Sequence, residues 1–151
     1  MIIRIDFNNR ETVEQLFHLQ RAAYLVEAEL IHFFDIPPLK ESLDELLKCE
    51  EQFFGYFEGK ELAGAISFTN KGEILTICRT VVHPNHFRKG IAQKLLKTVE
   101  EVNSEYPIVS VSTGKDNTPA KNLYMKNGYQ LVGDVEVASN FYISNFEKRK
   151  V

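Results

Sequence analysis

Tryptophan is absent from this 151-residue chain, and cysteine and methionine occur only twice each. Cys49 and Cys78 lie far apart, and neither belongs to a Cys-x-x-Cys pair or to a cluster of cysteine and histidine. Zinc sites in proteins need such spacing. We therefore expect both cysteines to be small buried apolar side chains, and we predict no metal site.

A basic surplus and a long apolar run are also missing. The formal net charge is -3, whereas a general nucleic-acid-binding domain carries excess positive charge. No apolar stretch approaches the ~20 residues that span a membrane, and the alternating residues 1–6 do not have the pattern of a signal peptide. We expect a cytoplasmic protein that binds neither nucleic acid nor membrane.

What the chain does contain is the composition of a globular protein. Apolar residues make up 44% and charged residues 26% of the sequence, which is typical of folded domains. A chain of this length can bury a substantial core, and it holds no repeat, low-complexity tract or linker. We expect one domain over residues 1–151.

The most informative stretch runs from Val81 to Ala92, VVHPNHFRKGIA. It ends an apolar, β-branched run that begins at Ile74 and predicts a buried strand. Pro84 cannot continue a strand ladder, so the strand ends before it. Apolar residues then recur at helical spacing from Ile91 to Val102, which predicts an amphipathic helix.

The junction between this strand and this helix has the character of an anion site. The first N–H groups of a helix have no intrahelical partner, and the helix dipole is positive there. Gly90 allows an anion to approach the backbone, while Arg88 and Lys89 add positive charge. These features favour a phosphate site. The alternative from these residues alone is an ordinary turn with solvated charges.

Turn, cap and periodicity signals predict the other elements. Asn8 or Asn9 caps a helix to about residue 28, and Pro37-Pro38 is expected to exclude regular structure after it. The remaining predictions are a strand over residues 1–7, a helix over 41–49, a hairpin of strands Gln52–Glu58 and Glu61–Thr69, a strand from 108, a helix that starts at Thr118-Pro119 and ends at Gly128, and closing strands Tyr129–Val137 and Phe141–Glu147. This order predicts an α/β sandwich with a mixed sheet.

Two blocks of the sequence resemble the GNAT superfamily, the acetyl-CoA-dependent N-acetyltransferases. VVHPNHFRKGIAQKLL resembles motif A, whose core is Gln/Arg-x-x-Gly-x-Gly/Ala; Gly90 and Ala92 match, and position 87 departs because it is Phe. STGKDNTPAKNLYMKNGY resembles motif B, and its matching positions are Asn117, Ala120, Leu123, Tyr124, Gly128 and Tyr129. The order and separation of the two blocks extend the resemblance over nearly the whole chain.

The resemblance implies a GNAT-like three-layer sandwich, with a mixed, mostly antiparallel central sheet flanked by helices. It implies acetyl-CoA as cosubstrate, with the pyrophosphate on the motif A amides. The pantetheine arm would pair with the backbone of Cys78 to Val82, where an N–H near Val81 faces the thioester carbonyl. Phe87 is expected to weaken the side-chain contribution without abolishing binding. The residues implied to bind the coenzyme are Val81, Val82, Phe87, Arg88, Lys89, Gly90, Ile91, Ala92, Asn117 and Tyr124.

Tyr124 is also the residue that the resemblance implies as general acid, because it stands where the motif B tyrosine protonates the departing thiolate. A phenol with an unperturbed pKa of about 10 stays protonated at neutrality. The central strand offers no carboxylate as general base. Glu27 and Glu29 are the candidates for that role, and the alternative is that they are solvated acids at a helix end. His83 and His86 are weaker candidates.

We predict an N-acetyltransferase that moves the acetyl group of acetyl-CoA to a primary amine, of a small molecule or a peptide, by direct attack. The alternative is a non-catalytic coenzyme A-binding sensor or partner-binding domain. The segment from Glu27 to Leu39, which covers the acceptor site in the family, carries no recognisable code for the amine. A homodimer paired through the closing strands, residues 129–147, is left open.

Overall fold

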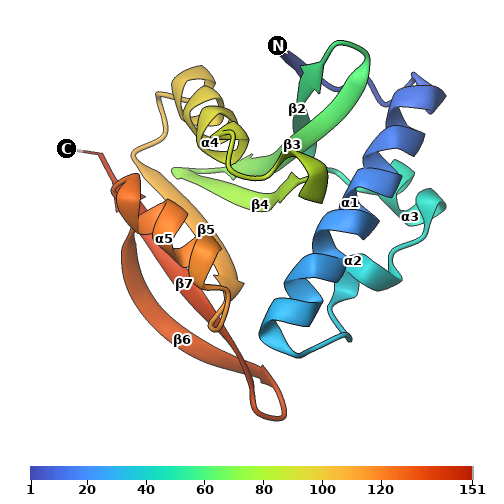
Figure 1. Cartoon of the computed structure of the whole chain (residues 1–151). Helices are drawn as coiled ribbons and strands as arrows, with labels where there is room; N and C mark the ends of the chain where they lie inside the picture. The colour runs from blue at the N-terminus through green and yellow to red at the C-terminus, as the bar shows by residue number, and fades with distance from the viewer. Residues whose placement is uncertain (151) are drawn as a thin grey trace.

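A central sheet of seven strands organises the computed structural model, which describes residues 1–150; Figure 1 shows how the elements are arranged. The strands lie in the order β1-β2-β3-β4-β5-β7-β6. Only β4 and β5 pair in parallel, and all the other neighbours are antiparallel. The bounds are β1 Ile2–Arg4, β2 Gln52–Glu58, β3 Glu61–Lys71, β4 Ile74–Val82, β5 Ile108–Gly114, β6 Gln130–Ala138 and β7 Phe141–Arg149.

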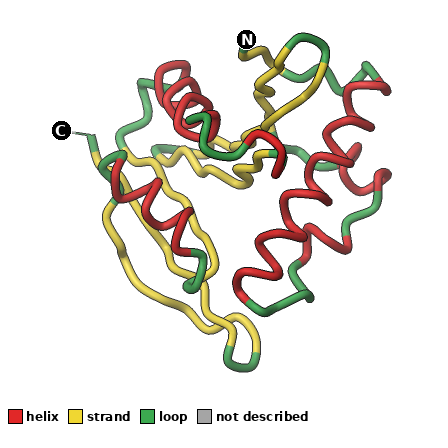
Figure 2. The backbone as a smooth tube through the Cα atoms, viewed as in Figure 1, coloured by secondary structure: helices red, strands yellow, loops and turns green. Residues whose placement is uncertain are grey.

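Helices cover both faces of the sheet and make it the middle layer of three (Figure 2). One core lies under α4 and α5, and the other lies under α1 and α3. The predicted three-layer sandwich with a mostly antiparallel sheet is therefore confirmed. The helices are α1 Arg10–Ile31, α2 Pro37–Lys40, α3 Leu43–Lys48, α4 Ile91–Val102 and α5 Thr118–Lys126, with a 3-10 turn, η1, at Pro84–His86.

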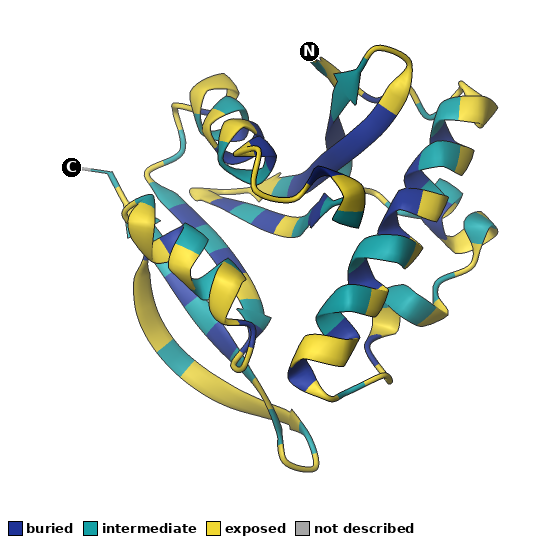
Figure 3. Ribbon diagram, in the orientation of Figure 1, coloured by how far each residue is buried: buried dark blue, intermediate teal, exposed yellow. Residues whose placement is uncertain are grey.

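Burial follows this layering (Figure 3). Residues 62–68 of the long strand β3 are all buried, and they contribute to both cores. β6 pairs only with β7 and forms one edge of the sheet, so most of its side chains are exposed. No helix within residues 1–150 is long and apolar enough to cross a membrane.

Helices α4 and α5 lie where the sequence predicts them, whereas α1 is longer than predicted and α3 is shorter than the predicted residues 41–49. Asn9 caps α1 by accepting a hydrogen bond from the N–H of Thr12 at 3.2 Å, and the helix continues three residues past the predicted end, to Ile31. Ser42 caps α3 in a capping box with Glu45. The first strand covers only Ile2–Arg4, which is shorter than the predicted residues 1–7.

The expectation that Pro37-Pro38 excludes regular structure is wrong. The short helix α2 begins at Pro37. The first turn of a helix has unpaired N–H groups in any case, so proline loses nothing there and its fixed φ suits the helix. Ile36, which precedes it, is extended as a residue before proline must be. An ion pair of 2.9 Å between Lys40 and Asp35 then closes the turn.

A bulge in β4 decides which side chains face which layer. The β3–β4 register shifts so that Cys78 has no partner in β3. Ile77, before the bulge, belongs to the core under α4 and α5, whereas Val81, after it, belongs to the core under α1. Because a bulge inverts the alternation of side chains, Arg79 and Val81 face α1 while Thr80 faces α5. Cys78 is exposed, so the expectation that it is buried is wrong.

The parallel strands β4 and β5 pair only over their first halves. The ladder joins Ile74–Ile77 to Ile108–Val111 and ends there, although β4 continues to Val82 and β5 continues to Gly114. Beyond the ladder the two strands diverge and leave the backbone of β4 without a partner on that side. This divergence opens the sheet at the edge of the motif A loop, next to the backbone that the family resemblance implied for the pantetheine arm.

Candidate active site

A cleft of about 640 Å³ opens at the divergence of β4 and β5. Its walls come from α1, from the end of β4, from the loop before α4 and from α5. All ten residues predicted to bind the coenzyme line this one cleft: Val81, Val82, Phe87, Arg88, Lys89, Gly90, Ile91, Ala92, Asn117 and Tyr124. Two blocks that are separate in the sequence are thus parts of one site.

The loop before α4 presents backbone N–H groups to the cleft. The helix begins at Ile91, and its first backbone bond runs from the N–H of Lys94 to the carbonyl of Gly90 at 3.1 Å. The N–H groups of residues 91–93 therefore have no intrahelical acceptor. Gly90 has φ 73° and Arg88 has φ 66°. Left-handed backbone at a non-glycine residue is strained and is typical of functional loops.

Side chains of the β2–β3 hairpin hold this loop in place. Lys89 Nζ lies 3.3 Å from a carboxylate oxygen of Glu58 and 3.0 Å from Nδ1 of His86. Nε2 of His86 lies 3.0 Å from Glu61. Nδ1 of His86 also lies 3.2 Å from a carboxylate oxygen of Glu58, and the hydrogen bond between His86 and Glu61 lowers the pKa of Glu61. His86 is therefore engaged in anchoring the loop, which leaves it a poor candidate for the base.

The end of β4 offers main-chain groups to the cleft. The N–H of His83 donates to the carbonyl of Ala63 in β3 at 2.8 Å. Because N–H groups alternate in direction along an antiparallel strand, that of Val81 also points to β3. Those of Thr80 and Val82 point the other way, into the gap between β4 and β5. The N–H groups available to a ligand are therefore the two that flank Val81.

Tyr124 reaches across the cleft from α5 to the same strand. Its side chain is buried, with 4% of its surface exposed, and its hydroxyl donates to Oγ1 of Thr80 at 3.3 Å. Burial raises the pKa of Tyr124 to about 12, although the hydrogen bond with Thr80 opposes the shift. The phenol is neutral at physiological pH and carries a proton that it can donate.

Glu27 faces Tyr124 from the opposite wall. Oε1 of Glu27 accepts a hydrogen bond of 2.7 Å from Nδ2 of Asn117, and Oδ1 of Asn117 caps α5 by accepting from the N–H of Ala120 at 3.2 Å. Burial raises the pKa of Glu27, and the hydrogen bond with Asn117 opposes that shift. Glu27 is thus a desolvated carboxyl group, and within residues 1–150 its second oxygen makes no hydrogen bond, which leaves it available to a ligand.

Glu29 does not reach the cleft. It is exposed and lies outside the lining residues, although it is only two positions from Glu27. Residues two apart on a helix point to different sides. Of the two acidic candidates, only Glu27 lies in the site.

Tyr24 is a lining residue that the sequence did not single out. Its position in the sequence matches the apolar positions of α1, but its side chain lines the cleft one turn before Glu27. The signal that identifies it is a polar stripe, Gln20, Tyr24 and Glu27, at helical spacing on an otherwise apolar face. Gln20 is itself 1% exposed, so this stripe faces the sheet and not the solvent.

Arg79 contacts Gln20, which lies at the N-terminal end of this polar stripe. Its guanidinium contacts both oxygens of Glu41, at 2.7 and 2.9 Å, and both oxygens of Glu51, at 2.9 and 3.1 Å. It also donates to Gln20 at 2.9 Å. The network fixes β4, α1 and the segment that carries α2 and α3 relative to one another, and so it sets the position of the α1 wall.

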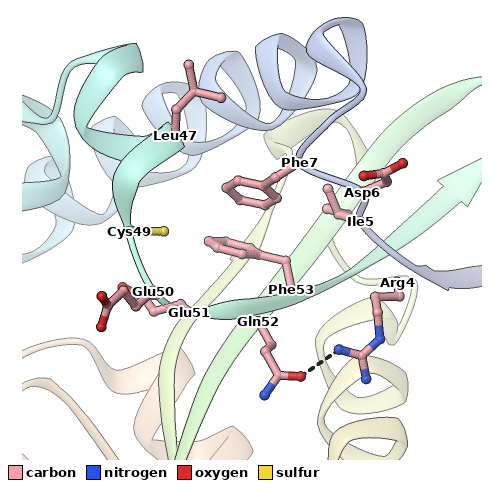
Figure 4. Close-up of a pocket in the computed structure, with 10 residues that line it drawn as sticks. All are labelled: Arg4, Ile5, Asp6, Phe7, Leu47, Cys49, Glu50, Glu51, Gln52 and Phe53. Atoms are coloured by element: carbon pink, nitrogen blue, oxygen red, sulfur yellow. Dashed lines mark hydrogen bonds between the residues drawn. The ribbon is translucent and has the colours of Figure 1, made fainter.

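A second hollow, of about 550 Å³, lies between the start of the chain and the α3–β2 connection (Figure 4). Two of its polar contacts are made within the protein. Arg4 donates to Gln52 at 2.6 Å, and Glu51 is held by Arg79. The phenyl rings of Phe7 and Phe53 pack at 5.2 Å and close its apolar side. None of the predicted site residues lines it.

Comparison with known proteins agrees with this geometry. The model of the acetyltransferase (GNAT) family matches residues 13–129. The chain belongs to the GNAT acetyltransferase family. Its members are acyltransferases that use acetyl-CoA, and the resemblance predicted from the two sequence blocks is confirmed. Along its whole length the chain is also 37% identical to the UPF0157 protein YqkA of Bacillus subtilis, and it spans 45% of the length of that relative.

Solved structures of low sequence identity share the fold. The PaiA N-acetyltransferase of Thermoplasma acidophilum in complex with coenzyme A has a TM-score of 0.81 at 18% identity, with 99% of this chain and 98% of that chain covered. The ribosomal-protein-S18-alanine N-acetyltransferase of Escherichia coli has a TM-score of 0.78 at 12% identity, with 99% and 92% covered. At these identities the likeness is one of fold.

Proposed function

We propose that this chain is an N-acetyltransferase that moves the acetyl group of acetyl-CoA to a primary amine by direct attack. The main support is the placement of Glu27 and Tyr124 on opposite walls of the cleft that also contains the motif A loop. Neither Cys49 nor Cys78 lines that cleft, so an acetyl-cysteine intermediate has no nucleophile there.

The coenzyme binds along the loop and the end of β4. Its pyrophosphate accepts hydrogen bonds from the N–H groups at the start of α4, with Arg88 supplying positive charge. Its pantetheine arm pairs with the main-chain groups of Thr80 and Val82 that face the gap. This path brings the thioester to the part of the cleft between Tyr124 and Glu27.

The reaction needs a neutral amine and a stabilised leaving group. The amine nitrogen attacks the thioester carbonyl carbon, the C–N bond forms, and Glu27 takes the proton that the nitrogen gives up. The C–S bond then breaks, and Tyr124 donates to the departing sulfur, on which charge develops. The proton on Glu27 leaves through solvent and restores the phenol. The products are the amide and the neutral thiol.

One feature favours a second candidate, a non-catalytic domain that binds coenzyme A as a sensor. The side of β4 that faces the cleft carries no carboxylate, so the only acid available as base comes from α1. The position of Glu27 favours the enzyme.

The cytoplasmic location, the single domain over residues 1–151 and a homodimer remain predictions of the sequence.

Titration calorimetry with acetyl-CoA, followed by a thiol-release assay with tyramine, spermidine, kanamycin and a short peptide, tests the proposal. We expect binding at one site and thiol release with at least one amine. Binding without release from any amine would favour the sensor. An absence of binding would contradict both candidates and would identify Phe87 as a substitution that disables the loop.

A further inference from the structure

The hydroxyl of Tyr24 is a polar group without a function in the fold. Only 8% of the side chain is exposed, and within residues 1–150 the hydroxyl makes no hydrogen bond. Within the described residues no fully buried side-chain nitrogen or oxygen lacks a hydrogen-bond partner, so the unpaired oxygen of Tyr24 is accessible, and Tyr24 lines the cleft. A phenylalanine would fill the same volume without the hydroxyl. The hydroxyl is therefore available to a ligand.

Tyr24 and Tyr124 approach the cleft from opposite layers. Tyr24 belongs to the core under α1, and Tyr124 belongs to the core under α5. Burial raises the pKa of Tyr24 above its ordinary value, the charge of Glu27 adds to the shift, and Arg79 opposes it. A neutral phenol can both donate and accept a hydrogen bond. The coenzyme thiol leaves on the Tyr124 side, so the Tyr24 side is where a nucleophile enters.

The charges of the cleft limit which amine can enter. Among the described residues that line it, Glu27 is the only acid, whereas Arg88, Lys89 and Lys126 carry positive charge. Glu27 already shares one oxygen with Asn117. A single carboxylate can compensate one ammonium group, and a second or third positive charge on the acceptor would have no partner in a desolvated site.

The rest of the α1 wall is apolar. Ala23, Val26 and Leu30 line the cleft on the same helical face as Tyr24 and Glu27. Leu30 remains 44% exposed, which places an uncovered apolar side chain at the outer end of the wall. An acceptor that places its amine between Tyr24 and Glu27 therefore lays its carbon skeleton against aliphatic side chains.

The family resemblance places the acceptor beside this part of α1, and we propose that the α1 wall of the cleft selects a monoamine with an apolar body. Tyr24 accepts a hydrogen bond from the amine and directs its lone pair to the thioester, Glu27 removes its proton, and Val26 and Leu30 bind the adjacent carbon atoms. This inference rests on the proposed acetyltransferase function and adds to it the class of acceptor and the role of Tyr24. Polyamines and aminoglycosides are poor acceptors for such a subsite.

Steady-state kinetics with 2-phenylethylamine, spermidine and kanamycin test the acceptor class. We expect kcat/KM for 2-phenylethylamine to exceed that for spermidine and kanamycin by at least about tenfold. Leu30→Glu adds a carboxylate at an exposed position and should shift this ratio toward spermidine. A preference of the unmodified protein for spermidine or kanamycin would overturn the inference and leave the proposed function intact. If no amine is acetylated although acetyl-CoA binds, both fail.

Tyr24→Phe tests the hydroxyl itself. We expect KM for 2-phenylethylamine to rise about tenfold, as for the loss of one hydrogen bond, with the Kd of acetyl-CoA unchanged and Tm unchanged or higher. Tyr129→Phe is the matched control, because the hydroxyl of Tyr129 bonds to Glu100 at 2.5 Å and lies outside the cleft. It should lower Tm and leave KM unchanged. An unchanged KM in Tyr24→Phe would overturn the proposed role of its hydroxyl. A lower Tm would overturn it too, because it would assign the hydroxyl to the fold.

Discussion

Glu27 of α1 and Asn117, the N-cap of α5, are joined by a hydrogen bond of 2.7 Å, although 90 residues separate them in the sequence. Asn117 also caps the helix that carries Tyr124, and seven residues, about two helical turns, separate the cap from the tyrosine. One side chain therefore sets the distance between the two walls of the cleft. This contact therefore holds the proposed base, Glu27, and the proposed acid, Tyr124, at a fixed distance from each other.

Replacement of Glu27 by Gln should stabilise the protein at neutral pH and abolish most of its turnover. Burial raises the pKa of Glu27 above the value of 4.5 that an exposed glutamate has. The folded state then binds the proton more tightly than the unfolded state, so wild-type stability falls as pH rises through the titration of this carboxyl. Gln keeps an oxygen for Asn117 and carries no charge. The gain in Tm should be present at pH 7 and should vanish below pH 4.

Glu29→Gln provides the control, because Glu29 is exposed on the same helix and lies outside the cleft. Its Tm and turnover should match the wild type at every pH. Thermal unfolding followed by circular dichroism between pH 3 and pH 8 measures both variants. A Glu27→Gln variant that is less stable than the wild type at pH 7 would contradict the assignment of Glu27 as a desolvated carboxylate.

Tyr124→Phe should lower kcat by about 10²-fold, the usual contribution of a positioned proton donor. The Kd of acetyl-CoA should change less than twofold, because the loop and the end of β4 remain. The variant also loses the hydrogen bond with Thr80, which is worth about 1 kcal/mol of stability. Thr80→Val breaks the same bond and keeps the phenol, so it should show the loss of stability with a much smaller loss of kcat. Equal kcat values in the two variants would exclude Tyr124 as the acid.

Gly90→Ala should weaken the binding of acetyl-CoA by tenfold or more. The backbone of Gly90 has φ 73°, and a Cβ at this position would meet no atom of the protein within 4 Å. The methyl group would occupy the open space that the pyrophosphate needs, and the left-handed backbone would lower stability by about 1 kcal/mol. Isothermal titration calorimetry and urea unfolding measure the two effects separately.

Gly72→Ala is the control that separates the effect of backbone strain on stability from the effect of an added methyl group on the binding of acetyl-CoA. Gly72 has φ 59° in the β3–β4 turn, also with no atom within 4 Å of an added Cβ, and it lies outside the cleft. It should show the same loss of stability with an unchanged Kd for acetyl-CoA. If the two variants bind the coenzyme equally well, the loop at Gly90 is not the phosphate site.

The sequence predicted best what is contiguous in the chain. The motif A loop is a strand, a turn and a helix N-terminus in immediate succession, so proline, glycine and helical periodicity locate Gly90 without knowledge of the rest. The motif B helix is equally local, since Asn117 caps the same element that presents Tyr124. For these parts local physical chemistry is sufficient.

Sequence patterns did not predict the contacts between residues that are distant in the chain. The bulge at Cys78 inverts the faces of β4, and regular alternation along the strand gives no sign of it. Arg79 consequently turns toward α1 and not toward α5, where it meets Glu41 and Glu51. Tyr24 was hidden for a related reason, because an aromatic residue on an apolar helical face looks like part of the core until its hydroxyl is found without a partner.

The ion pairs of Arg79 with Glu41 and Glu51 are expected to contribute to the free energy of unfolding. The Arg79 side chain is 11% exposed, and those of Glu41 and Glu51 are 15% and 19% exposed. Arg79→Ala would leave two carboxylates facing each other with little solvent and no cation, so we expect unfolding free energy to fall by about 3–5 kcal/mol. Arg10→Ala, which breaks an exposed pair with Glu14, should change it by less than about 0.5 kcal/mol.

A rescue experiment distinguishes uncompensated charge from lost packing. Glu41→Gln and Glu51→Gln added to Arg79→Met remove all the charges of the network together and retain side chains of similar length. Well-packed neutral residues often replace a buried ion pair without loss, so the triple variant should recover most of the stability in urea unfolding. If the triple variant is as unstable as Arg79→Ala, the packing and hydrogen bonds of Arg79 stabilise the α1 wall. In that case the neutralisation of the charges of Glu41 and Glu51 is not the cause of the stability.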